Sequence, residues 1–127
     1  VELYGNAIIA NTDFAEANPE IVTAFLSAVV QGWNAAIADP AAGAAAVIER
    51  NPAGDAALEQ RRLELAIDAN VMTEFVMTNG MGAIDAERME TALEQLALTY
   101  EFQTEPDASV YFTDAYLPPS DARMLSQ

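Results

Sequence analysis

Residues 18–40, NPEIVTAFLSAVVQGWNAAIADP, contain the pattern that decides the fold class of this chain. Asn18 precedes Pro19, and proline is favoured in the first turn of a helix because the N–H that it lacks would have no partner there. Apolar residues then recur at helical spacing for about five turns, at Val22, Phe25, Leu26, Val29, Val30, Trp33 and Ile37. The pattern predicts a long helix whose apolar stripe, Trp33 included, packs in a core.

Three further helices are predicted downstream by their start signals. Asp39-Pro40 repeats the combination of a capping residue and proline, and it predicts a helix from Ala41 to about Arg50. Its alanine-rich first half is typical of a thin, closely packed helix. Asp55 and Asp85 are expected to cap a third and a fourth helix, because an aspartate side chain accepts hydrogen bonds from the first backbone N–H groups of a helix.

The N-terminal segment from Val1 to Asn11 predicts a single β-strand, since Ala7-Ile8-Ile9-Ala10 is a short apolar run of the buried-strand type. A strand cannot stand alone, because its backbone groups need partners. Ser109 to Thr113 is the only other strand candidate, and a weak one. The fold class expected is therefore mostly α, with about four helices and one N-terminal strand, and part of the sheet is expected to lie elsewhere.

Two shorter segments complete the expected organisation. Thr12 is expected to be the N-cap of a short first helical turn before Asn18. Asn79 to Gly82 is a loop by composition. The chain is divided into residues 1–117 and a polar tail, residues 118–127, which begins at Pro118-Pro119 and is expected to be loosely held.

Composition excludes several classes of function. The chain has 127 residues and a formal net charge of −15, with 20 acidic residues against five basic ones, so nucleic acid and anionic membrane surfaces are unfavourable partners. Absent cysteine and histidine exclude thiolate metal sites, cysteine nucleophiles and a Ser-His-Asp triad within this chain. Neither a metal nor a cofactor is expected. The stretch Ala41 to Ile48 is the longest nearly apolar run noted, and it is too short to span a bilayer, so a soluble chain is expected.

Most charged clusters have an ordinary structural interpretation. Arg61-Arg62 could bind an anion, but each arginine has an acid three residues away on the same helix, Glu64 and Glu59 respectively. Pairs of carboxylates could in principle serve acid–base or metal chemistry, and three such pairs occur, at Asp85/Glu87, Glu90/Glu94 and Glu101/Glu105. Nothing in the sequence marks a pocket around them, so the favoured interpretation is that they lie on solvated helix faces.

Tyr4, Gly5 and Asn6 are the candidate ligand-binding residues. Tyrosine offers a ring and a hydroxyl, asparagine a donor and an acceptor, and glycine allows a ligand to approach the backbone. Ordinary turn chemistry explains the Gly5-Asn6 pair equally well, so both interpretations stay open at this level. No catalytic residue is expected.

An ordered series of segments resembles one family. It comprises Tyr4-Gly5-Asn6-Ala7-Ile8-Ile9-Ala10, Asp13-Phe14, Asn18-Pro19-Glu20, Ala24-Phe25-Leu26, Gly32-Trp33, Ala35-Ala36-Ile37, Asp39-Pro40, Asn51-Pro52, Asn79-Gly80-Met81-Gly82, Asp85-Ala86-Glu87-Arg88 and Tyr111-Phe112-Thr113-Asp114-Ala115-Tyr116-Leu117. In this order they are similar to the later part of the periplasmic substrate-binding proteins of the nitrate/sulfonate/taurine and thiamine-pyrimidine-precursor type, which feed ABC importers.

The resemblance implies a C-terminal portion of a longer protein with a two-lobe α/β periplasmic-binding-protein (type II) fold. The sheet partners of the N-terminal strand and most ligand contacts would then lie in the preceding portion. It further implies a small-molecule solute, permease subunits in the membrane as partners, and a periplasmic or extracellular, membrane-anchored location. By analogy, Tyr4 and Asn6 lie near the cleft between lobes. The expected solute is a thiamine pyrimidine precursor, with a sulfonate, nitrate or another small organic solute as the nearest alternative.

Two other classes of function remain open from the sequence. One is an enzyme of pyrimidine-precursor synthesis on the same fold, which would need a catalytic histidine and a cofactor-holding lysine outside these residues. The other is a free-standing helical interaction module. A binding protein rather than an enzyme is the expectation, and the 127-residue chain by itself is expected to self-associate, because it would expose apolar surface.

Overall fold

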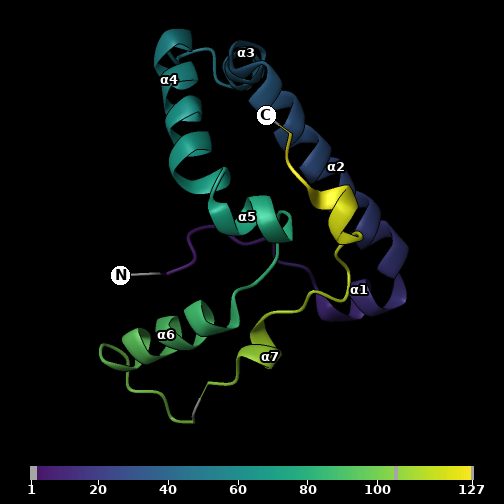
Figure 1. Ribbon diagram of the computed structural model, residues 1–127, viewed down its shortest axis with the longest axis vertical. Coiled ribbons are helices and arrows are strands. Elements are labelled where there is room, and N and C mark those ends of the chain that lie inside the picture. The colour runs from purple at the N-terminus through teal and green to yellow at the C-terminus, as the bar shows by residue number, and fades with distance from the viewer. Residues whose placement is uncertain (1–2, 105, 127) are drawn as a thin grey trace.

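The computed structural model describes residues 3–104 and 106–126 and consists of helices joined by short connections (Figure 1). The elements are α1 (Thr12–Ala17), α2 (Pro19–Ala38), α3 (Pro40–Arg50), α4 (Ala56–Ala66), the π-helical turn η1 (Ile67–Val71), α5 (Glu74–Asn79), α6 (Ala86–Ala97), α7 (Ala108–Tyr111) and the 3-10 turn η2 (Ser120–Arg123). The described residues contain no β-strand. The expectation of a mostly α chain is confirmed, and the two-lobe arrangement stays a prediction.

Three predicted helix starts are confirmed by cap geometry. The Asp39 carboxylate accepts the Ala42 N–H at 3.0 Å, and that of Asp55 accepts the Leu58 N–H at 2.7 Å. Asp85 caps α6 in the same way, at 3.1 Å from the N–H three residues on. Each cap satisfies one of the backbone donors that a helix leaves unpaired at its beginning.

Other local predictions were wrong. The N-cap of α1 is Asn11 rather than Thr12, because the Asn11 side chain accepts the Phe14 N–H at 2.9 Å. Ser109 to Thr113 is not a strand: Asp107 accepts the Ser109 N–H and begins the single helical turn α7. Helix α5 lies in a stretch where no helix was expected, and the Thr73 hydroxyl caps it by accepting the N–H of Val76.

The predicted N-terminal strand is also absent from the described residues. Residues 3–10 have no regular structure, and Asn11 is the N-cap of α1. The backbone N–H and C=O groups of residues 5–10 have no hydrogen-bond partner within the described part of the chain. The side chains of Ile8 and Ile9 are 54% and 92% exposed. Because a strand forms only when another strand supplies its ladder partners, an apolar β-prone run without one remains a chain without regular structure.

The closest helix packing joins α3 to α4. A methyl group on Gly43 would lie only 2.8 Å from the Leu63 side chain, so glycine lets the two helices approach closely. Ala44, one residue on, is 2% exposed. The thin, closely packed helix predicted from the alanine-rich sequence is therefore confirmed, and the remaining core is small, with Ile67 of η1 among its few buried members.

Helix α2 leaves several of its large apolar residues exposed. Val30 is its only buried residue, while Trp33 is half-buried and Phe25 and Ile21 are 56% and 53% exposed. The predicted stripe therefore packs only in part, and Trp33 is not a fully buried core residue. Part of the apolar surface of α2 is therefore without cover in this structure.

By length and composition, α2 is also long and apolar enough to cross a membrane. The sequence-based view that Ala41 to Ile48 is the longest apolar stretch is thus wrong. Core helices of soluble proteins pass the same test, and α2 has polar side chains that are bonded within the fold. The Thr23 hydroxyl donates to the carbonyl of Tyr116 at 2.9 Å, and Asn34 accepts the Ser126 N–H at 2.8 Å.

The C-terminal tail is docked rather than loosely held. It runs along α2 in yellow in Figure 1 and forms η2 there. Leu125 and Arg123 are both buried in it, although the tail is polar in composition. The Arg123 side chain donates to the carbonyls of Pro118 and Met81, at 2.8 and 2.6 Å. The tail therefore joins α2 to the loop that follows α5.

Candidate functional site

The structure separates the three predicted ligand-binding residues by environment. Tyr4 is half-buried, whereas Gly5 and Asn6 are exposed. The space around the α-carbon of Gly5 is open, so a ligand could approach the backbone there. No side-chain hydrogen bond of Asn6 is found among the described residues. Ligand binding by Tyr4, Gly5 and Asn6 stays a prediction.

The hydroxyl of Tyr4 is engaged with the backbone at the beginning of α6. It accepts the Asp85 N–H at 2.9 Å and donates to the carbonyl of the same residue at 3.4 Å. These contacts join residues 81 positions apart in the sequence. Tyr4 therefore supports the N-terminal end of α6 in this structure.

The ring of Tyr4 is also in contact with α6 and α7. The guanidinium carbon of Arg88 lies 4.6 Å from the ring centroid, within the range of a cation–π interaction. Arg88 also donates to the carbonyl of Leu3 at 3.0 Å. The ring of Phe112 lies 6.2 Å away, centroid to centroid, and is tilted by 44°. Two side chains that are far apart in sequence, Arg88 and Phe112, thus meet at the ring of Tyr4.

An apolar hollow of about 340 Å³ borders this cluster between α6 and α7. Met89, Leu93 and Phe112 supply apolar walls, and Glu90 and Ser109 supply polar atoms. A second hollow, of about 430 Å³, lies where the α2–α3 connection meets α4 and η1, with Glu64 and Asp68 beside apolar side chains. Both hollows are open to solvent.

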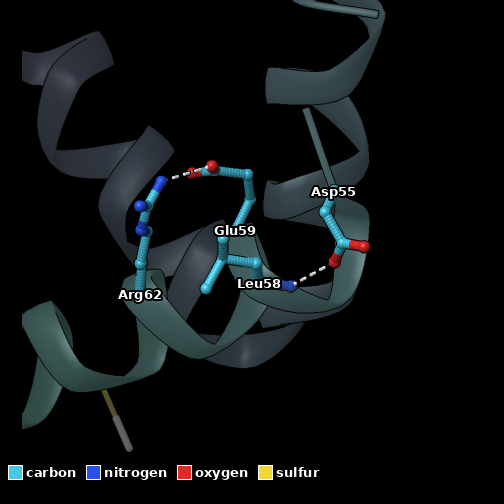
Figure 2. A network of polar contacts seen from close by, with 4 residues as sticks. All are labelled: Asp55, Leu58, Glu59 and Arg62. Carbon is cyan, nitrogen blue, oxygen red and sulfur yellow. Dashed lines mark hydrogen bonds and ion pairs between the residues drawn. The ribbon is translucent and has the colours of Figure 1, made fainter. Parts of the chain in front are cut away.

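Of the neighbouring Arg61 and Arg62, Arg62 forms the ion pair that was expected within its helix. Figure 2 shows Arg62 beside Glu59, with 2.8 Å between the guanidinium and the carboxylate, next to the Asp55 cap of the same helix. The Arg62 part of the predicted pairing is confirmed. The predicted Arg61–Glu64 pair is not found in the described residues, and the Glu64 carboxylate accepts a hydrogen bond from Gln60 instead.

The carboxylates form no metal centre in the described part of the chain, where no group of three or more potential ligands is close enough to hold an ion. Within the described part of the chain, the carboxyl group of Asp107 has a pKa below its ordinary value. The Ser109 hydroxyl donates to it at 2.7 Å and the Ser109 N–H at 2.9 Å, and these bonds lower the pKa of Asp107. Asp107 is exposed and caps α7, so its role is structural.

Sequence reasoning missed the partners of Tyr4. Asp85 was expected to cap a helix, and it does so with its side chain while its backbone binds Tyr4. Nothing in the local pattern around Arg88 or Phe112 points to residue 4. Such contacts follow from the tertiary fold, which a single sequence does not specify at this range.

One comparison with known proteins gives a match. The family model described as NMT1/THI5-like matches residues 1–43, about a third of the chain's 127 residues. The matched stretch contains the Tyr4-Gly5-Asn6 segment, α1 and α2. Over this short stretch the match supports a relation to the nitrate/sulfonate/thiamine-precursor binding family and, in general terms, a solute-binding role. No match is found among the curated proteins or among the solved structures.

Proposed function

We propose that this chain is the C-terminal portion of the solute-binding component of an ABC importer, and that it is not an enzyme. The observation that carries the proposal is the family match over residues 1–43, because it falls on the segment with the candidate ligand-binding residues. The proposed solute is a thiamine pyrimidine precursor, with a sulfonate or nitrate next. The proposed partners are permease subunits in a membrane, and the proposed location is periplasmic, or extracellular and membrane-anchored.

Two features of the structure support a larger assembly around this chain. Ile8 and Ile9 lie in an apolar segment whose backbone groups have no partner among the described residues, as expected for a strand without its sheet. The outer face of α2, with Ile21 and Phe25, is apolar and exposed. In the proposed protein, both would be covered by the α/β lobes.

The proposed mechanism is a population shift between open and closed lobes. A solute favours the closed state when it contacts both lobes only in that state. Tyr4, Gly5 and Asn6 would contribute one side of the solute site. The exposed Asn6 amide could donate and accept a hydrogen bond, and Gly5 would leave room for the solute beside the backbone.

The first experiment is the intact mass, with N-terminal sequencing, of the protein purified from its native source. A mass more than twice 13.6 kDa is expected, with Val1 internal. A native mass of 13.6 kDa that begins at Val1 would contradict the proposal and favour a helical interaction module.

The second experiment is thermal unfolding of that native protein with an aminopyrimidine thiamine precursor, taurine or nitrate. One of them is expected to stabilise it by about 2.7 kcal/mol at a hundredfold excess over its dissociation constant. An Asn6→Ala variant should bind the same solute more weakly, whereas Asn70→Ala, an exposed control on η1, should not. No stabilisation by any of the three solutes would contradict the proposed solute class.

A further inference from the structure

The pair Asn79-Gly80 contains two groups that can react with each other. It is the one place in the sequence where glycine directly follows asparagine. Asparagine is a thermolabile residue, because the backbone nitrogen of the next residue can attack its side-chain carbonyl carbon. Glycine has no Cβ to hinder that approach. Asn79 is exposed and Gly80 is buried, so one half of the pair faces solvent and the other half faces the protein.

Hydrogen bonds hold both reacting groups in the folded chain. The Gly80 N–H donates to the Val76 carbonyl at 2.8 Å and closes the end of α5. The carboxamide nitrogen of Asn79 donates to the carbonyl of Phe75 at 3.0 Å. The attacking nitrogen and the leaving nitrogen are thus both bonded to carbonyls of α5, and both bonds must break before the two residues can react.

The C-terminal tail holds the same turn from the other side. Gly80 has a φ angle of +81°, and a Cβ on it would lie 3.1 Å from the Arg123 Cβ and 3.1 Å from the Ser120 carbonyl oxygen. The Arg123 guanidinium donates to the carbonyl of Met81, the residue that follows. The turn that would have to rearrange for the attack therefore lies against η2 and is bonded to a buried arginine.

We propose that Asn79-Gly80 is a deamidation site, and that the docked tail suppresses the reaction through Arg123. In the first step the Gly80 nitrogen bonds to the Asn79 Cγ, the Cγ–Nδ2 bond breaks, and the amide group leaves as ammonia with the hydrogen that Gly80 loses. Water then opens the resulting cyclic imide at either carbonyl, which leaves an aspartate or an isoaspartate at position 79. No other reactant is needed. This proposal does not depend on the proposed function, and a failed solute screen leaves it standing.

Either product weakens the turn that the tail contacts. A carboxylate has no hydrogen to donate at neutral pH, so it cannot replace the bond from the Asn79 amide to the Phe75 carbonyl. An isoaspartate also adds a methylene group to the main chain directly before Gly80, which displaces the turn from Ser120 and Arg123. Deamidation and release of the tail therefore favour each other, because an undocked tail frees the site and a modified site fits the tail less well.

The test follows deamidation at position 79 of the 127-residue chain by peptide mass spectrometry in mildly alkaline buffer. Arg123→Met removes the guanidinium, and in the folded chain it is expected to raise the rate about tenfold or more, because a charged hydrogen bond no longer opposes local opening. Ile67→Ala is the matched control, since it destabilises the buried core at η1 and leaves the Arg123 contacts in place. A folded Arg123→Met variant that reacts no faster than Ile67→Ala overturns the proposal.

A second measurement keeps the proposal falsifiable if Arg123→Met does not fold. The parent chain is incubated both folded and unfolded in urea, and the unfolded chain is expected to react about tenfold faster or more, because it lacks both bonds to the α5 carbonyls. Asn79→Gln should abolish the signal in both states, which assigns the reaction to this residue. Equal rates in the two states would overturn the protection by the fold, and no reaction in urea would overturn the site itself.

Discussion

Met81 and Arg123 are joined by two hydrogen bonds that run in opposite directions. The Met81 N–H donates to the Arg123 carbonyl at 2.9 Å, and the Arg123 guanidinium donates to the Met81 carbonyl at 2.6 Å. Arg123 is only 9% exposed, and the partners found for its guanidinium in the described residues are backbone carbonyls, Pro118 being the second. The buried guanidinium of Arg123 is thus held by the loop that contains Met81, and it fixes that loop in turn.

Arg123→Met is therefore expected to lower the free energy of unfolding by about 2–3 kcal/mol, because it leaves two carbonyls without their charged donor. Urea titration measures the loss. Arg61→Met, at an exposed position on α4, is the control and should change stability by less than about 0.5 kcal/mol. Equal effects of the two substitutions would mean that the hydrogen bonds of the Arg123 side chain do not stabilise the fold.

Gly80→Ala is expected to destabilise the chain by about 1–3 kcal/mol, since a Cβ at positive φ is strained. It would also meet the Arg123 Cβ and the Ser120 carbonyl at 3.1 Å. Gly32→Ala is the matched control: it lies within α2, and its new Cβ would meet nothing within 4 Å. That substitution should stabilise by up to about 1 kcal/mol through helix propensity. Thermal unfolding of both variants checks the opposite signs.

Asp55→Ala is expected to cost about 1 kcal/mol, because the first turn of α4 loses the acceptor for the Leu58 N–H. The neighbouring Arg62→Ala should cost less than about 0.5 kcal/mol, since the Arg62 side chain is 64% exposed in its ion pair with Glu59. Chemical denaturation of the two variants compares a backbone cap with a surface ion pair on one helix. A larger loss for Arg62→Ala would contradict this ranking.

The cap of α7 is expected to weaken in acid. Hydrogen bonds from Ser109 lower the folded-state pKa of Asp107, so the stabilisation is fully present above the unfolded pKa and is lost as the pH falls through the folded one. Ser109→Ala should raise the pKa of Asp107 toward its ordinary value, because it removes the hydroxyl hydrogen bond that lowers this pKa most. A titration of the carboxyl carbon by NMR measures this. An unshifted pKa in the variant would show that the hydroxyl bond has no effect.

The 127-residue chain is expected to self-associate at micromolar concentration through its uncharged segment from Leu3 to Asn11, where apolar surface is exposed. Ile8→Ser combined with Ile9→Ser should shift the sedimentation coefficient toward that of a monomer. Leu65→Ser, on an exposed residue of α4, should leave it unchanged. A monodisperse monomer of the parent chain in light scattering would contradict the expectation.

Helix starts could be predicted from this sequence because their signals are local. Asp39, Asp55 and Asp85 each cap the helix that was expected to follow. The N-terminal strand could not be confirmed, because strand formation depends on partners that the described chain does not supply. Helix α5 was missed since its apolar residues show no regular stripe and its cap is a single threonine hydroxyl.

The candidate site could be predicted only in part. Tyr4 was singled out for its chemistry, and it does lie at a junction of elements. Its hydroxyl, however, binds the backbone of Asp85, and its ring lies under Arg88. These contacts span more than 80 residues and depend on how α6 is placed, which neither spacing nor composition specifies.

The bonds between α2 and the tail also set an order of events during synthesis. Thr23 binds the carbonyl of Tyr116, and Asn34 binds Ser126, so each partner is made 92 or 93 residues later. At ribosomal rates of roughly 5–20 residues per second, about 5–20 s pass between the synthesis of α2 and that of these partners. During that interval the nascent, nearly uncharged 20-residue helix is without its C-terminal cover, and its apolar side chains are exposed to water.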